Sequence, residues 1–149
     1  MRKNIFEEAY KEIQKAKKAY NAAEKANDTE GQAAARVLYN KAAALLDGLT
    51  GVDITIWRAY EAARDCGNEY LDLNDNISDE EVSELVARMK DYGIEAFTFS
   101  STWSSAVETA WLFQQAGCTL AGLVEINSQY KAFMSNEYEK AHGYLFKLS

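Results

Sequence analysis

A run of hydroxyl side chains surrounds one tryptophan in the second half of the chain. Phe97, Thr98 and Phe99 alternate apolar and polar side chains, which is the period of a β-strand. The residues of the following loop that could contact a ligand are Ser100, Ser101, Thr102, Trp103 and Ser104. Hydroxyls and free backbone N–H groups at such a strand-to-helix connection can bind a phosphate or another ligand. Ser105 opens an S-x-x-E pattern typical of a capping box, so the hydroxyls could instead serve only the helix that follows.

The residues near this loop do not complete a phosphate site or a nucleophilic centre. No Lys or Arg lies within the loop, and the pattern G-x-x-x-x-G-K-[ST] is absent. A serine nucleophile needs a base, and the only histidine, His142, has the surface-type residues Glu139 and Lys140 beside it. The sequence therefore predicts no catalytic residue and no cofactor. A ligand-binding role for the loop stays open beside an architectural one.

Acidic residues dominate the stretch that precedes this strand. The net charge is −7, but residues 1–64 hold 11 basic and 9 acidic residues, whereas residues 65–149 hold 5 and 14. The acids that we expect to form a partner-binding surface are Asp72, Asp75, Asp79, Glu80, Glu81 and Glu84. Such a surface repels nucleic acid and anionic membranes and attracts basic protein surfaces, including those that hold nucleic acid. An EF-hand loop starting at Asp72 would need Gly where Ile77 stands, so no metal site is predicted.

The first third of the chain has the pattern of two amphipathic helices. Over residues 3–26 apolar side chains recur every seven positions, and over residues 30–47 they form a second stripe. The members of that second stripe are Ala34, Leu38, Ala42, Leu45 and Leu46. A short polar turn joins the two segments, where Asp28 or Thr29 can cap the second helix. Residues 1–50 are therefore expected to form a helical hairpin, with its seam satisfied internally or across a homodimer.

Residues 51–149 are expected to form a compact α/β domain. Helices are predicted over 53–66, capped by Asp53, over 78–92, opened by a capping box at Ser78, and over 105–116. Strands are predicted over 69–73, 95–99 and 119–126. This order predicts an α-rich α/β fold with a small βαβαβ three-layer module and a mainly parallel sheet. A short helix over 135–142, followed by an edge strand or a loop at 144–148, completes the expected order.

Two tryptophans receive different interpretations. The helix over 105–116 is apolar nearly all round, so we expect it to be covered on most sides and Trp111 to lie in the core. Trp103 sits in the polar loop, where it either anchors a partner or packs over the end of the sheet.

Composition indicates a folded protein of the cytoplasm. No apolar run approaches the roughly 18 residues of a membrane span, and the N-terminus lacks the apolar stretch of a signal peptide. Cys66 and Cys118 are too few for a disulfide scaffold or a zinc site and are interpreted as small buried residues.

Part of the chain also resembles a known group of proteins. The stretches 93–115, 122–127 and 137–146, of which the first includes the pattern FTFSSTWSSAVETAWLFQQ, resemble a family of small uncharacterised proteins carried on phages and mobile elements of Gram-positive gut bacteria. The resemblance covers roughly residues 65–149. It implies a mobile-element protein acting inside a bacterial host cell, and no catalytic residues carry over.

These observations favour a non-enzymatic acidic interaction protein. In the mobile-element setting it would be an inhibitor of host defence of the anti-CRISPR type, which competes for the basic channel of a nucleic-acid-binding nuclease. The alternative is a small α/β ligand- or phosphate-binding module, or an enzyme, that uses the Ser100–Ser105 loop. A third interpretation is a homodimeric scaffold built on the N-terminal hairpin.

Overall fold

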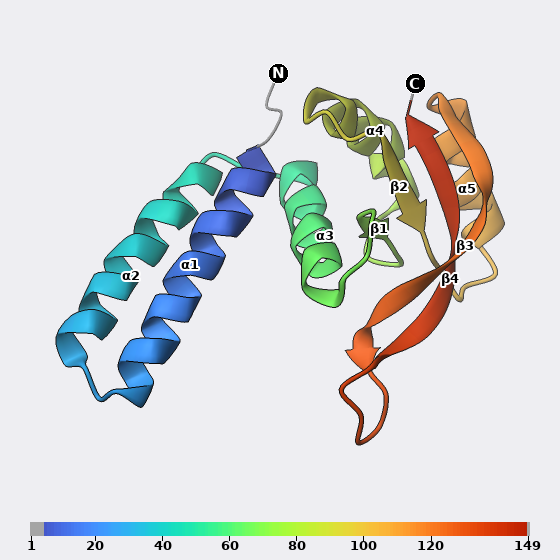
Figure 1. The fold of residues 1–149 in the computed structure, drawn as a ribbon. Helices are drawn as coiled ribbons and strands as arrows, with labels where there is room; N and C mark the ends of the chain where they lie inside the picture. The colour runs from blue at the N-terminus through green and yellow to red at the C-terminus, as the bar shows by residue number, and fades with distance from the viewer. Residues whose placement is uncertain (1–4, 149) are drawn as a thin grey trace. The chain divides into compact units, whose positions relative to one another are not determined.

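The structure, a computed structural model, describes residues 5–148, which divide into two compact units between Leu49 and Thr50. The first unit contains helices α1 (Ile5–Lys25) and α2 (Thr29–Ala43) and the 3₁₀ turn η1 (Ala44–Leu46). α1 and α2 lie side by side and antiparallel (Figure 1). Asp28 caps α2, as the sequence indicates, because its Oδ1 accepts a hydrogen bond from the Gly31 N–H at 3.0 Å. Within the described residues no helix has both the length and the apolar character that crossing a membrane requires.

Small side chains bring α1 and α2 together. α2 buries only Ala35 and Ala42, which lie seven residues apart. A Cβ atom on Gly31 would stand 3.0 Å from the Ala23 Cβ, so the backbones are already in close approach there. The prediction that Leu38 belongs to the apolar seam is wrong, since this side chain is 50% exposed. The interaxial distance of two packed helices depends on the side chains at the contact, and α2 buries alanines there while Leu38 stays exposed.

The second unit combines three helices with a four-stranded sheet (Figure 1). Its elements in chain order are α3 (Val52–Cys66), β1 (Asp72–Leu73), the 3₁₀ turn η2 (Asp79–Glu81), α4 (Val82–Asp91), β2 (Ala96–Phe99), α5 (Ala106–Gln115), β3 (Cys118–Lys131) and β4 (Tyr138–Leu148). The fold is thus a mixed α/β fold.

The sheet has the strand order β1-β2-β4-β3. β1 pairs parallel with β2, whereas β4 pairs antiparallel with both β2 and β3. The predicted βαβαβ module with a mainly parallel sheet is therefore wrong, because β4 inserts between β2 and β3 and makes the sheet mixed. Residues 138–142, which we predicted as part of a helix over 135–142, lie in β4. Glu139, Lys140 and Ala141 favour helix locally, but pairing along the length of β3 overrides that preference.

Four phenylalanines form the contact between α5 and the sheet. The Phe113 ring centroid lies 5.0 Å from that of Phe97, 5.5 Å from that of Phe99 and 5.4 Å from that of Phe146. Only Thr109 and Phe113 of α5 are buried. The prediction that Trp111 lies in the core is wrong, since it is 52% exposed. The sheet covers one side of α5, and the composition of a helix does not reveal how many of its sides meet a neighbour.

The helix starts differ from those expected. Neither Ser105 nor Ser78 uses its side chain as a cap, so both predicted capping boxes are wrong. Asp53 is not the cap of α3 either, because it lies inside the helix and is 3% exposed. Its carboxylate accepts two hydrogen bonds from Arg88 of α4, from Nε at 2.9 Å and from Nη2 at 2.8 Å. This ion pair joins α3 to α4, and it raises the pKa of the Arg88 guanidinium.

Candidate functional site

The predicted acidic surface and the predicted hydroxyl loop are neighbours in the structure. The parallel pairing of β1 with β2 places Asp72 opposite Thr98 and lets both strands end at the same edge. Asp72 Oδ1 accepts a hydrogen bond from Thr98 Oγ1 at 2.7 Å, and its Oδ2 accepts one from Ser100 Oγ at 2.6 Å. Asp75 accepts another from the Ser101 hydroxyl. Residues of two candidate sites, 26 to 28 positions apart in sequence, therefore form one surface.

Asp72 is a partly buried carboxyl with two hydroxyl donors. Burial raises its pKa, and the negative charge of Asp75 acts in the same direction. The hydrogen bonds from Ser100 and Thr98 act in the opposite direction, because they stabilise the charged form. Asp72 therefore holds β1 to β2 at the edge of the site, and it is less free for a partner than the sequence suggested.

Asp79 connects the acidic segment to α5. Its Oδ1 accepts a hydrogen bond from Thr109 Oγ1 at 2.7 Å. Asp79 is nevertheless exposed, as are Glu80 and Glu84, while Glu81 is half-buried. Apart from Glu81, the acids predicted to bind a partner thus fall into two groups. Asp72 and Asp75 make hydrogen bonds at the base of the loop, and Asp79, Glu80 and Glu84 face solvent.

The residues of the hydroxyl loop also fall into a hydrogen-bonded group and an exposed group. The Ser100 and Ser101 hydroxyls donate hydrogen bonds to the carboxylates of Asp72 and Asp75. Ser101 Oγ also accepts a hydrogen bond from the Trp103 N–H at 3.1 Å. A phosphate at these two serines would meet the negative charge of the same carboxylates, which disfavours the phosphate interpretation. Thr102, Trp103 and Ser104 are exposed, and Trp103 keeps 63% of its surface in solvent.

Trp103 shares a small cavity with the acids. This cavity has a volume of 270 Å³, and its lining includes Asp75, Asp79, Ser101, Trp103 and Thr109. The structure thus brings an exposed aromatic ring from the predicted ligand loop next to two carboxylates from the predicted partner surface.

A larger cavity shares Asp75 with this small one. It has a volume of 620 Å³ and is lined by residues from the end of α3, the β1 and β2 loops and the β3–β4 ribbon. Its ionisable lining residues are Cys66, Asp72, Asp75, Tyr130, Lys140 and His142. His142 lies on β4 opposite Glu125 and is exposed, and it is not the helix C-terminal residue that we predicted. Across residues 5–148 no serine hydroxyl is hydrogen-bonded to His142, so the cavity contains no assembled Ser–His pair.

Two asparagines that the sequence did not single out hold this cavity together. The Asn127 N–H donates to Asn68 Oδ1 at 2.9 Å, and Asn68 Nδ2 donates to the Asn127 carbonyl at 2.8 Å. Asn127 Nδ2 also donates to the Cys66 carbonyl at 2.8 Å, which ties the end of α3 to β3. Nothing in the sequence marks this pair, because the two residues are 59 positions apart and belong to no recognised motif.

Neither cysteine nor acid clusters indicate a metal centre. Cys66 and Cys118 are buried free thiols, as predicted, and burial raises the pKa of each. The part of the chain that the structure describes has no group of three or more His, Cys, Asp or Glu side chains placed to hold a metal ion.

Comparison with known proteins gives one match. Residues 55–148 match the model of a family described as a domain of unknown function (DUF7698). No curated protein matches the chain, and no solved structure does. The matched range includes the whole sheet, the hydroxyl loop and the acidic segment, and it omits α1 and α2.

Proposed function

The chain belongs to the DUF7698 family of unknown function, and from its surface we propose that it is a non-enzymatic interaction protein that binds a basic surface of another protein. The charge supports this proposal. Eight acids and no basic residue lie between positions 65 and 87, in a chain with a pI of about 4.8. A field of one sign speeds the encounter with a partner of opposite sign and suppresses binding to nucleic acid.

The observation that carries the proposal is the position of Trp103 beside the acids. Binding energy at protein interfaces is concentrated in a few residues, and Trp is enriched among them. Here the exposed ring lines one cavity with Asp75 and Asp79, and the exposed carboxylates of Glu80 and Glu84 follow in the same segment. Such a surface offers an aromatic anchor and carboxylates to arginine and lysine side chains.

The proposed action is competition. Carboxylates on the acidic segment would occupy the Lys and Arg side chains that normally contact phosphates, so the partner could not hold its nucleic acid. In the mobile-element setting that the sequence resemblance implies, the partner would be a nuclease of host defence, and the protein would be an inhibitor of the anti-CRISPR type inside the bacterial cell.

The test compares two variants that change charge equally. The first is the triple variant Asp79→Asn, Glu80→Gln and Glu84→Gln. The matched control is Glu8→Gln, Glu24→Gln and Asp47→Asn, which neutralises three exposed acids of the first unit. Each protein is added to purified RNA-guided nucleases, and DNA cleavage is measured at low and high salt.

We expect the wild type and the control variant to inhibit cleavage at low salt, and the first variant to inhibit much less because its association is slower. Salt should weaken inhibition by the wild type, since it screens exposed charges. Full inhibition by the first variant at every salt concentration would contradict the acidic-surface mechanism. Absence of inhibition across the nuclease panel, together with no salt-sensitive binding to it, would contradict the proposal itself.

The second candidate function is binding of a small ligand in the 620 Å³ cavity. Two carboxylates, one lysine and one histidine line this space, which has the size of a small-molecule site. A ligand that binds there should raise the melting temperature, and Ser101→Leu should abolish the shift. A broad panel of metabolites that produces no shift would leave this function without support.

A third candidate is a homodimeric scaffold that uses the first unit. Val37 and Leu38 on α2 are 67% and 50% exposed, so this helix carries apolar surface that a second copy could cover. Sedimentation of a monomer at micromolar concentration would exclude it.

A further inference from the structure

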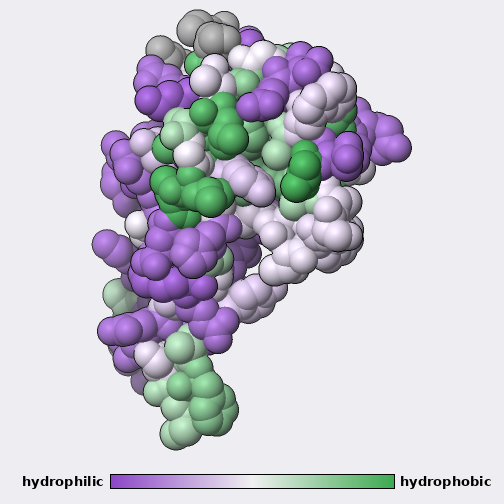
Figure 2. All heavy atoms as spheres, turned by 90° about the vertical axis from the view of Figure 1, so that its right-hand side faces the viewer, coloured by the Kyte–Doolittle hydropathy of each residue, from purple (hydrophilic) through white to green (hydrophobic). Residues whose placement is uncertain are grey.

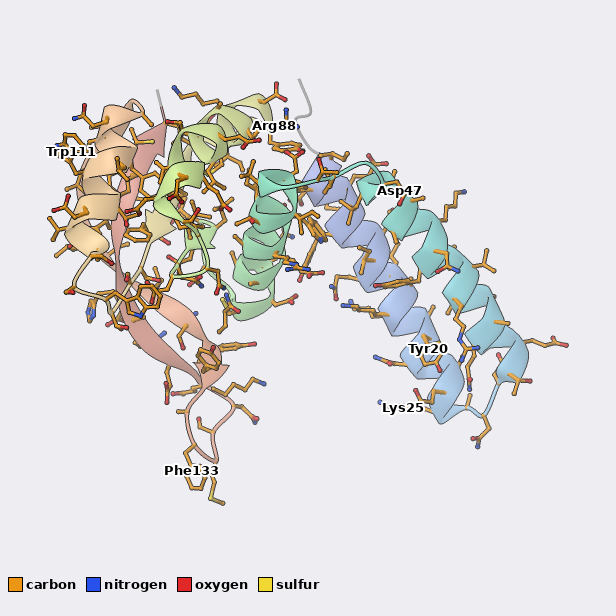
Figure 3. The ribbon with its side chains drawn as sticks, turned by 180° about the vertical axis from the view of Figure 1, so that it is seen from behind. Tyr20, Lys25, Asp47, Arg88, Trp111 and Phe133 are labelled. Carbon is orange, nitrogen blue, oxygen red and sulfur yellow. The ribbon has the colours of Figure 1, made fainter. Side chains whose placement is uncertain are left out.

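Large apolar side chains are exposed on one side of α5 and in the loop just before it. Trp103, Val107 and Trp111 are 63%, 66% and 52% exposed. They follow one another at intervals of four residues, so Val107 and Trp111 project from successive turns of the helix and Trp103 precedes them. We call these three residues the apolar ridge. Figure 3 shows Trp111 on the side of α5 that faces away from the sheet.

Packing of the core does not account for the apolar side chains of the ridge. Thr109 and Phe113 are the buried residues of α5, and their positions lie on the opposite side of the helix from Val107 and Trp111. Phe113 packs against the sheet, and Thr109 donates a hydrogen bond to Asp79. Leu123 of β3, which pairs with Tyr144 of β4, is another exposed apolar residue of this unit, at 70% exposure. Figure 2 faces the side of this unit on which α5 lies and shows hydrophobic side chains exposed among hydrophilic ones. Two tryptophans and a valine in solvent form a costly surface unless a partner covers it.

Charge is distributed unevenly along the apolar ridge. Asp75 and Asp79 line the cavity at its Trp103 end, and Glu108 is exposed on the first turn of α5. At the other end the Lys90 Nζ lies beside Gly117, where a Cβ atom would be 3.7 Å away. The apolar ridge is therefore acidic where α5 begins and has a basic side chain where α5 ends.

We infer that the apolar ridge is the docking site for an amphipathic cationic helix of the partner. The inference rests on the proposed function, and it names the part of the partner that binds. Side chains one turn apart form a ridge that fits the groove of a second helix, so a helix is the occupant that this spacing suits. The partner helix places its apolar stripe on Trp103, Val107 and Trp111. Its arginines face Asp79 and Glu108, and one of them can stack on the Trp103 ring.

The experiment uses the full chain and two synthetic peptides of identical composition. Each peptide has about five helical turns, or about 18 residues, of leucine and arginine. In one peptide leucines recur at helical spacing, and in the other the order is scrambled so that no apolar stripe forms. Affinity is measured by fluorescence anisotropy for the wild type, for the double variant Val107→Ser and Trp111→Ser, and for the control Phe133→Ser and Met134→Ser. The control residues are 92% and 91% exposed in the β3–β4 connection, where Figure 3 shows Phe133 at the far tip.

We expect the wild type and the control variant to bind the amphipathic peptide at least about tenfold more tightly than the scrambled one, as loss of a few anchor residues typically changes affinity by that factor or more. The double variant should lose this preference and retain weak, salt-sensitive binding to both peptides. A second variant, Val107→Lys, keeps the helical propensity and should lose the preference in the same way if the double variant folds poorly.

The outcomes separate this inference from the proposed function. Equal binding of both peptides that depends on Asp79, Glu80 and Glu84 would overturn the inference and leave the acidic-surface function standing. Absence of binding to either peptide would overturn both. A double variant that keeps the tenfold preference would overturn the inference, and so would sedimentation showing that Val107 and Trp111 instead hold two copies of this chain together.

Discussion

Phe113 attaches α5 to the sheet, so truncating it should test how the apolar ridge is held in place. Its side chain is fully buried, and its ring contacts those of Phe97, Phe99 and Phe146 at centroid distances of 5.0 to 5.5 Å. Replacing a core Phe by Ala costs about 3–5 kcal/mol. Because three aromatic contacts are lost together, we expect Phe113→Ala to lower the free energy of unfolding by about 4 kcal/mol. Phe113→Leu keeps most of the volume and should cost about 1.5 kcal/mol.

The assay is urea unfolding followed by tryptophan fluorescence. All three tryptophans, at positions 57, 103 and 111, belong to the second unit, so the signal follows that unit without α1 and α2. Phe133→Ala is the matched control, because the same truncation on a side chain 92% exposed should change stability by less than about 0.5 kcal/mol. Hydrogen exchange provides a local measurement, in which the amides of α5 should exchange faster in Phe113→Ala than those of β3.

Either of two results would refute this reasoning. A loss below about 1.5 kcal/mol for Phe113→Ala would mean that other contacts hold α5. An equal loss for Phe133→Ala would mean that burial does not decide the cost. A further result bears on the ridge, because a loosened α5 that still prefers the amphipathic peptide would show that docking does not need a rigid helix.

Three further predictions concern other parts of the molecule. Burial raises the pKa of Asp72, so its folded form binds a proton more readily, and its contribution to stability falls as pH rises above about 3.9. Asp72→Asn should therefore gain stability relative to the wild type between about pH 4 and about pH 7, as measured by urea unfolding at both values. Gly31→Ala should destabilise the first unit by about 1 kcal/mol, because the new Cβ would lie 2.3 Å from Oδ2 of the capping residue Asp28. In other helix positions the same change normally favours the helix. Circular dichroism during thermal unfolding measures the effect, and a gain in stability would contradict the prediction. The Cys66 thiol should react slowly with a disulfide reagent because burial raises its pKa. Asn68→Ala removes a tie to β3 and should speed the reaction by exposing the thiol, although loss of the Nδ2 donor 3.2 Å from the sulfur acts in the opposite direction. An unchanged rate would show that the amide does not protect the thiol.

Local patterns predicted those elements whose residues act through near neighbours. The Asp28 cap, the burial of both thiols and the strand at Phe97–Phe99 depend on contacts within a few positions or on residue type alone. The capping boxes at Ser78 and Ser105 also looked local, yet neither forms. Ser105 is in a helical backbone conformation, and Asp79 instead accepts a hydrogen bond from Thr109, a residue of another helix. The residue next to Ser78 thus makes a tertiary contact, which no local pattern indicates.

The candidate surface could be predicted only in pieces. The acidic segment and the Trp103 loop each stood out by composition, but their union depends on the register of β1 against β2, which places Asp72 beside Thr98 and Ser100. The Asn68–Asn127 pair gave no sequence signal, and of the apolar ridge the sequence singled out Trp103 alone as a possible anchor. The first needs two residues 59 positions apart to meet, and the second depends on which side of α5 the sheet covers.

The sequence by itself determined the charge asymmetry, the residue types at the surface and the approximate positions of most helices and strands, because these follow from composition and from periodicity over a few turns. Tertiary structure alone decided the strand order, the exposure of Trp111 and the meeting of the acids with the hydroxyls. The physical reason is that β4 inserts between β2 and β3 by pairing with distant residues, and the sheet so formed covers one side of α5 only. Which side of a helix remains in solvent, and which carboxylates remain free for a partner, are properties of those long-range contacts.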